Sequence, residues 1–190
     1  MRRSLYLLAV IMIGAASVAS AQRAITVARL LPSQGNGPPA FAAHVSNLLD
    51  DPDFVDRWNN AFYIQVHWKV QLWKSNLIIN SSLPPVEWNV CVRQVPGLDL
   101  FSHTEGKKDT TFSKVDSLKA HLLQDVTLGQ PKGLGRGEWY YLIDVHVSTA
   151  VENPCDPRVA VKSGGILNGI MLGNGPTRDL PQVRLTFPVR

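Results

Sequence analysis

The sequence predicts a mainly β fold of the α+β kind: an antiparallel sheet or sandwich with two short helices. Three observations support this expectation. Several segments alternate apolar and polar residues with period two, only two segments have apolar residues at helical spacing, and turn-forming residues separate these segments. Because successive side chains of a strand point to opposite faces, each alternating segment has one apolar and one polar face.

The longest alternating segment is FYIQVHWKVQLWK, residues Phe62–Lys74. Its even-numbered positions up to 72 are all apolar, and most of its odd-numbered positions are polar. A strand with one polar face is typical of an antiparallel sheet, because parallel strands are covered on both faces. We therefore expect a long strand whose apolar face lies in the core and whose Gln65, Lys69 and Gln71 are largely exposed.

Three further segments alternate in the same way, and they are Val86–Val92, Glu138–Ser148 and Val183–Val189. Trp68, Trp88 and Trp139 each fall on the apolar face of a separate strand, so we expect them to form an aromatic layer in the core. Pro188 interrupts the last segment, which predicts an edge strand. Residues 24–31 and 98–103 are weaker strand predictions.

Two segments have helical spacing of their apolar residues, Pro39–Leu49 and Ser113–Leu123. Ser113 is the expected N-cap of the second helix, with an acidic residue three positions later. His44 and His121 then lie in helices, where we expect surface or rim positions. The acidic cluster between positions 50 and 56 is interpreted as a solvated helix end.

Residues 1–21, MRRSLYLLAVIMIGAASVASA, are expected to be a secretory signal peptide, which leaves residues 22–190 as a single β-rich globular domain in the periplasm or outside the cell. The segment has a basic start, a small-residue end and an apolar run shorter than the roughly 20 residues of a membrane-spanning helix. An uncleaved anchor is the alternative. Cleavage would remove two arginines and lower the net charge from +4 to +2. We therefore expect no nucleic-acid binding, and no membrane span after cleavage.

The chain has two cysteines, Cys91 and Cys155. In an exported protein they could form a disulfide, and they could equally be two unrelated thiols. A disulfide would close a loop of roughly 65 residues and stabilise the fold by about 4 kcal/mol in the chain-entropy model.

Common catalytic and phosphate-binding motifs are absent from the sequence, so we expect no cofactor. His67 and His146 lie on the polar faces of two expected strands, and Asp144 shares the face of His146. If these strands are neighbours, the three residues could bind a metal ion or form an acid–base pair. They could equally be ordinary polar residues of a solvated sheet face.

A glycine-rich segment with large apolar side chains, GGILNGIMLGNG, runs from Gly164 to Gly175. Its five glycines disfavour a helix or a central strand. The segment either folds over the core or forms an exposed apolar patch that binds a partner. Its apolar residues are Ile166, Leu167, Ile170, Met171 and Leu172.

Several motifs follow one another along the chain: Leu72-Trp73-Lys74, the strand of Trp88, the helix entry Phe112-Ser113 with Leu118, and Gly137-Glu138-Trp139-Tyr140-Tyr141. Their order resembles a family of uncharacterised exported bacterial proteins, a domain of unknown function. The resemblance covers roughly residues 24–148. It implies export and a β-rich domain, and it brings no catalytic residues.

The leading functional hypothesis is a non-enzymatic binding or accessory protein of the cell envelope that presents a sheet face or the glycine-rich segment to an unidentified protein or ligand. The alternative is a metal-assisted hydrolase that uses His67, Asp144 and His146.

Overall fold

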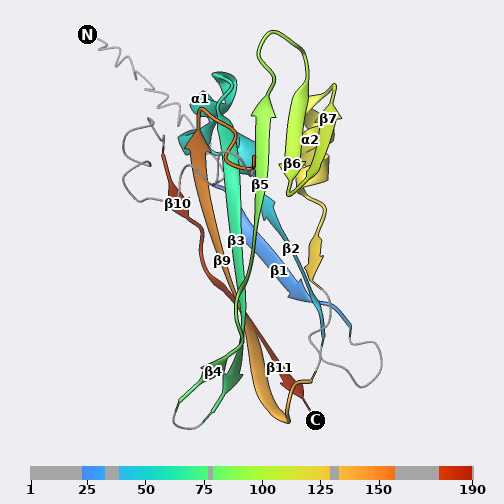
Figure 1. Cartoon of the computed structure of the whole chain (residues 1–190), viewed down its shortest axis with the longest axis vertical. Coiled ribbons are helices and arrows are strands. Elements are labelled where there is room, and N and C mark those ends of the chain that lie inside the picture. The colour runs from blue at the N-terminus through green and yellow to red at the C-terminus, as the bar shows by residue number, and fades with distance from the viewer. Residues whose placement is uncertain (1–22, 33–38, 77–78, 129–132, 157–175, 190) are drawn as a thin grey trace, which may run out of the picture.

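The computed structural model describes residues 23–32, 39–76, 79–128, 133–156 and 176–189. In this part of the chain it shows antiparallel strands in two sheets and two short α-helices, which confirms the mainly β class (Figure 1). In chain order the elements are β1 (Ile25–Leu30), β2 (Phe41–Ser46), the 3-10 helix η1 (Leu48–Asp50), α1 (Pro52–Asn59), β3 (Tyr63–Ser75), β4 (Ser81–Ser82), β5 (Val86–Gln94), β6 (Phe101–Glu105), β7 (Lys108–Phe112), α2 (Val115–Leu122), β8 (Val126–Leu128), β9 (Gly137–Ala150), β10 (Arg178–Asp179) and β11 (Val183–Val189).

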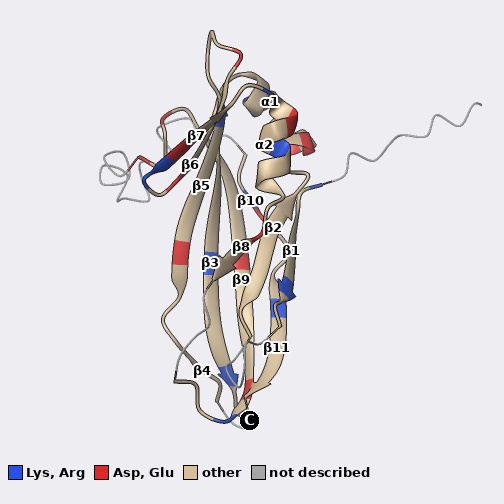
Figure 2. Ribbon diagram, turned by 90° about the vertical axis from the view of Figure 1, so that its right-hand side faces the viewer, with Lys and Arg blue, Asp and Glu red and all other residues tan. Residues whose placement is uncertain are grey.

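The two sheets form a sandwich-like arrangement. The small sheet has the order β1-β2-β8, and the large sheet has the order β10-β9-β3-β5-β6-β7, with β11 paired to β9 and β4 paired to β3. Figure 2 shows the small sheet and both helices on the same side of the large sheet. We call this side of the large sheet its inner face and the opposite side its outer face.

The inner face of the large sheet carries the core. The predicted long strand is confirmed as β3, and its residues Ile64, Val66, Trp68, Val70 and Leu72 are buried. Trp68 and Trp139 are buried as expected, whereas Trp88 is only partly buried. Because Trp68 and Trp88 are directly opposite on β3 and β5, their rings stack with centroids 5.4 Å apart. The expected aromatic layer therefore forms, with Trp88 at its margin.

The outer face is less exposed than the alternation predicts. Gln65, Lys69 and Gln71 are half-buried, so the expectation that they are largely exposed is wrong. The reason is that β3 lies between β5 and β9, whose side chains shield its own. In addition, the Gln71 amide donates hydrogen bonds to the Ser82 hydroxyl and the Leu83 carbonyl, at 3.1 and 3.4 Å.

The prediction of a helix over Pro39–Leu49 is wrong, because this segment forms strand β2 and the short turn η1. Strand β2 is the central strand of the small sheet and bonds to β1 on one side and β8 on the other. Phe41, Ala43 and Val45 are buried on one face of β2, and Ala42 on the other face is buried as well. The successive alanines in FAAHV are compatible with both helical spacing and the period of two of a strand. Pairing with two neighbouring strands favours the strand.

The two α-helices are short, as expected, but only one of them lies where the sequence predicted it. Helix α2 confirms the helix expected within residues 113–123, although its N-cap is Lys114 rather than Ser113 and makes no side-chain hydrogen bond. Helix α1 begins after Asp51, which caps it, and has Pro52 in its first turn, a favourable N-terminal combination.

Asp51 is completely buried, so the interpretation of the acidic cluster as a solvated helix end is wrong for this residue. Its carboxylate accepts hydrogen bonds from the backbone N–H groups of Ala24 and Asp53, both at 2.9 Å, and pairs with Arg178. Burial alone would raise the pKa of Asp51, but the hydrogen bonds from Arg178, Ala24 and Asp53 outweigh burial and lower it. This carboxylate therefore joins β10 and the start of β1 to helix α1.

Cys91 and Cys155 form a disulfide, with their Cα atoms 6.0 Å apart. Cys91 lies on the outer face of β5, so the bond fixes the segment that follows β9 to this face. The predicted edge strand is confirmed as β11, which pairs only with β9 among the described strands. No helix in the described part of the chain has the length and apolar character needed to cross a membrane.

Candidate functional site

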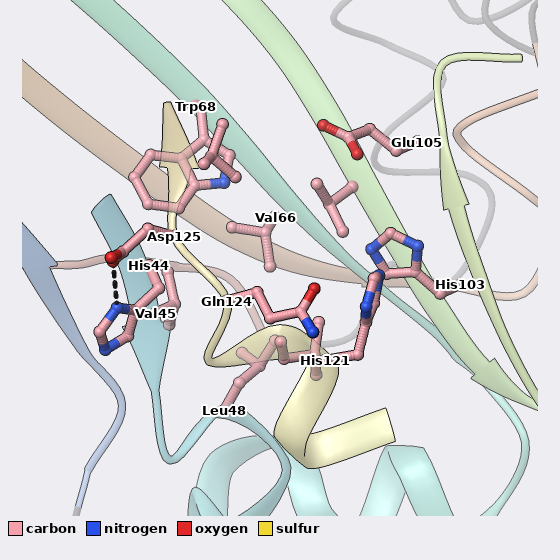
Figure 3. A pocket seen from close by; sticks show the side chains of 13 residues that line it. His44, Val45, Leu48, Val66, Trp68, His103, Glu105, His121, Gln124 and Asp125 are labelled. Atoms are coloured by element: carbon pink, nitrogen blue, oxygen red, sulfur yellow. Dashed lines mark hydrogen bonds and ion pairs between the residues drawn. The ribbon is translucent and has the colours of Figure 1, made fainter. Parts of the chain in front are cut away.

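A partly open pocket of about 180 Å³ lies between the two sheets, beside helix α2 (Figure 3). It is built from segments far apart in the sequence: β2 and η1, β3, β5, β6, and the stretch from α2 to β8. The lining residues are His44, Val45, Leu48, Val66, Trp68, Val90, His103, Glu105, His121, Leu122, Gln124, Asp125 and Val126.

One side of the pocket is apolar because inner-face residues of several strands meet there. Val66 and Trp68 come from β3, and Val90 comes from β5. Val45 of β2 and Leu48 of η1 face them from the other layer. The same period-two alternation that builds the core therefore supplies the apolar wall of the pocket.

The polar side of the pocket begins on β6, where two polar residues occupy the inner face. The register pairs His103 with Val92 and Glu105 with Val90, so both residues share the face of these core valines. Figure 3 shows the rings of His103 and His121 close together on one side of the pocket. Their centroids are 4.6 Å apart and their planes are perpendicular.

His103 is only 7% exposed, and its surroundings favour the uncharged imidazole. Burial, followed by the positive charges of His121 and Lys108, lowers the pKa of His103 to about 4. At neutral pH the ring is therefore uncharged and offers one N–H donor and one nitrogen acceptor.

On the opposite side of the pocket, His44 bonds to Asp125, with Nδ1 2.9 Å from a carboxylate oxygen (Figure 3). Asp125 also pairs with Arg29 of β1. The hydrogen bond from His44, together with the positive charge of Arg29, lowers the pKa of Asp125 despite opposing desolvation. Asp125 is thus ionised, and its charge is compensated by its neighbours.

The polar groups of the pocket are imidazoles, carboxylates and one amide. Its described lining residues include no Ser, Thr, Cys or Lys, but His, Asp and Glu are themselves groups that can take part in catalysis. An apolar wall with a few convergent polar groups is the usual composition of a small-molecule site.

The structure places the three residues of the expected metal site on the outer face, away from this pocket. His67 of β3 is directly opposite His146 of β9, so the condition that their strands are neighbours is met. Asp144 is opposite Lys69 and accepts a hydrogen bond from Gln182.

Each of the two outer-face histidines bonds to a partner of its own. Nδ1 of His67 lies 2.8 Å from Asn89 Oδ1, and Nδ1 of His146 lies 2.8 Å from Asp179 Oδ1. Within the part of the chain that the structure describes, no three His, Cys, Asp or Glu residues are grouped so that they could hold a metal ion.

The glycine-rich segment lies outside the described residues, so the structure gives no account of Ile166, Leu167, Ile170, Met171 and Leu172. Sequence reasoning missed the pocket because it placed His44 and His121 at surface or rim positions of helices and gave His103 and Glu105 no role. One signal was present. His103 and Glu105 are two positions apart and therefore share one face of a strand.

The comparisons with known proteins identify no relative: no family model, no curated protein and no solved structure matches this chain.

Proposed function

We propose that this chain is an exported, non-enzymatic binding protein and that a small ligand occupies the pocket between its two sheets. The observation that carries the proposal is the pocket itself. Its apolar wall, which includes Trp68, faces a cluster of imidazole and carboxylate side chains in a cavity of about 180 Å³. An engineered apolar cavity of roughly 150 Å³ binds benzene, so this volume suits a ligand with one small ring or a branched chain.

Two features support export. Residues 1–21 have the pattern of a secretory signal peptide. The Cys91–Cys155 disulfide is of a kind that persists in oxidising compartments and is rare in the cytosol.

The alternative function, a metal-assisted hydrolase, draws support from the cross-strand pair of His67 and His146. Its direct test is titration of the disulfide-bonded protein with Zn²⁺ while the ring resonances of both histidines are followed. Saturable binding that is lost in His146→Gln would favour the hydrolase.

The pocket can be tested with a neutral probe, 2-phenylethanol, added to ¹⁵N-labelled protein that an expression host has secreted with its disulfide intact. We expect the indole N–H resonance of Trp68, assigned with Trp68→Phe, to shift saturably. Gln124→Trp should weaken this binding, because Gln124 is an exposed lining residue and an indole there would obstruct the pocket.

The matched control is Thr127→Trp, which places the same side chain on an exposed position of β8 outside the pocket lining. If 2-phenylethanol leaves Trp68 unchanged, or binds equally to the Gln124→Trp and Thr127→Trp variants, the pocket is not the ligand site.

A further inference from the structure

The charges that line the pocket are unevenly distributed. The described lining contains two carboxylates, Glu105 and Asp125, and no Lys or Arg. Asp125 is compensated, because Arg29 and His44 both bond to it. Glu105 makes no side-chain hydrogen bond or ion pair within the described part of the chain, so its carboxylate is available to a ligand.

Glu105 is well placed to act on the contents of the pocket. It shares the inner face of β6 with His103, and it pairs in register with Val90 of the apolar wall. Figure 3 shows its carboxylate directed toward the side of the pocket that Trp68 occupies. A positive group between them would lie near a carboxylate and an indole ring, both of which attract cations.

An anionic ligand, unlike a cation, would be repelled by these groups. Its charge would be brought toward the carboxylate of Glu105, an exposed residue, with no lysine or arginine in the described lining to compensate it. Uncharged His103 provides a nitrogen that can accept a hydrogen bond from an N–H group. The polar groups of this site therefore complement a ligand that carries hydrogen-bond donors and a positive charge.

We propose that the pocket takes a small organic cation, a primary amine whose apolar body is about the size of one benzene ring. The ammonium group lies at Glu105, within the polar side of the pocket, and the body lies against Val45, Leu48, Val66 and Val90. This inference rests on the proposed function, since it names the ligand class of the same pocket.

Lys108 is the cation that competes with such a ligand. It is directly opposite Glu105 in the β6–β7 hairpin, is exposed, and lies outside the pocket lining. Removing its charge with Lys108→Met should therefore strengthen binding of an amine and leave binding of a neutral compound unchanged.

A series of three matched compounds tests the proposal: 2-phenylethylamine, 2-phenylethanol and 3-phenylpropanoate. They have the same ring and nearly the same length but differ in charge. Each is titrated into the secreted, disulfide-bonded protein at about pH 8, where exposed histidines are uncharged. Binding is read from the indole N–H resonance of Trp68. Because Glu105 is exposed, we expect the amine to bind about two- to fivefold more tightly than the alcohol, and the carboxylate to bind more weakly than the alcohol.

Glu105→Gln should abolish the preference for the amine, so that the amine and the alcohol bind about equally. The matched control is Glu87→Gln, which removes the same charge from the outer face and should preserve the preference. Equal binding of amine and alcohol, tighter binding of the carboxylate, or a preference that survives Glu105→Gln would overturn the organic-cation proposal while leaving the pocket as a ligand site. If none of the three compounds shifts Trp68, the proposal and the proposed function both fail.

Discussion

The inner and outer faces of the large sheet carry histidines in different ways. On the outer face, His67 and His146 have hydrogen-bond partners on neighbouring strands, and both rings are partly open to solvent. On the inner face, His103 is buried against His121 at the margin of an apolar core. A polar residue on a solvated face costs little, whereas one buried beside the core costs stability. The inner-face histidines are therefore the unusual ones, and we infer a function at the inner face.

The largest expected difference between the faces concerns packing. Trp68→Ala should lower the free energy of unfolding by about 3–5 kcal/mol, because it removes a buried ring that stacks on Trp88. Gln71→Ala on the outer face should cost about 1 kcal/mol, since it removes hydrogen bonds from a half-buried side chain. Urea denaturation of both variants measures the difference, and equal losses would show that the faces are assigned wrongly.

The disulfide that joins Cys155 to the outer face should stabilise the fold. Replacing both cysteines, Cys91→Ala with Cys155→Ala, should lower the free energy of unfolding by about 4 kcal/mol, because the bond closes a long loop, with a sequence separation of 64. Chemical denaturation of the double variant and of the wild-type protein, each with and without reductant, provides the comparison. Reductant should lower the free energy of unfolding of the wild-type protein but not that of the double variant. If reductant leaves the free energy of unfolding of the wild-type protein unchanged, the prediction is contradicted.

Acidification should affect the inner face selectively. Burial lowers the pKa of His103 to about 4 in the folded protein. The unfolded chain therefore binds a proton at His103 near pH 6.5, whereas the folded protein binds it only near pH 4. The contribution of His103 to the free energy of unfolding is therefore lost as the pH falls from about 6.5 to about 4, by about 3 kcal/mol in total. The charged and titratable groups around it are His121, Lys108 and Glu105.

His103→Leu should remove this part of the pH dependence, whereas the outer-face variant His146→Leu should retain it. Urea denaturation at a series of pH values measures the effect. The prediction is contradicted if the two variants and the wild-type protein lose stability in parallel between pH 6.5 and pH 4.

The smallest effect is expected on the outer face. His67→Gln should change the free energy of unfolding by less than about 0.5 kcal/mol, because the ring is partly exposed and its polar contacts can be replaced by water. A thermal denaturation scan is sufficient to measure this. A loss of several kcal/mol would show that the outer-face histidines are structurally as important as those of the pocket.

Much of the fold follows from period-two alternation. It predicts β3, β5, β9 and β11 and their apolar faces, because each face is determined within one segment. It fails at β2, where small residues suit both periods and the choice depends on pairing with β1 and β8. It also fails to predict the half-buried outer face, since shielding depends on which strands are neighbours.

The candidate site was less accessible to sequence reasoning. His44, His103 and His121 are far apart in the chain and meet only because β2 and α2 both cover the inner face near β6. The sequence of residues 101–105 does not predict that His103 pairs with Val92 of the core, because this register depends on both β5 and β6. By contrast, the sequence suggested a metal site on the condition that the strands of His67 and His146 are neighbours. The two residues are indeed paired, but no three metal-binding groups come together in the described part of the chain.

We infer that the inner-face pocket, rather than the outer-face histidines, is the ligand site. The deciding experiment maps the resonances that shift when 2-phenylethylamine is added to the labelled, disulfide-bonded protein. We expect saturable shifts at Trp68, His103 and His121, with His67 and His146 unchanged. Shifts confined to His67 and His146, with Trp68 and His103 unaffected, would contradict this inference.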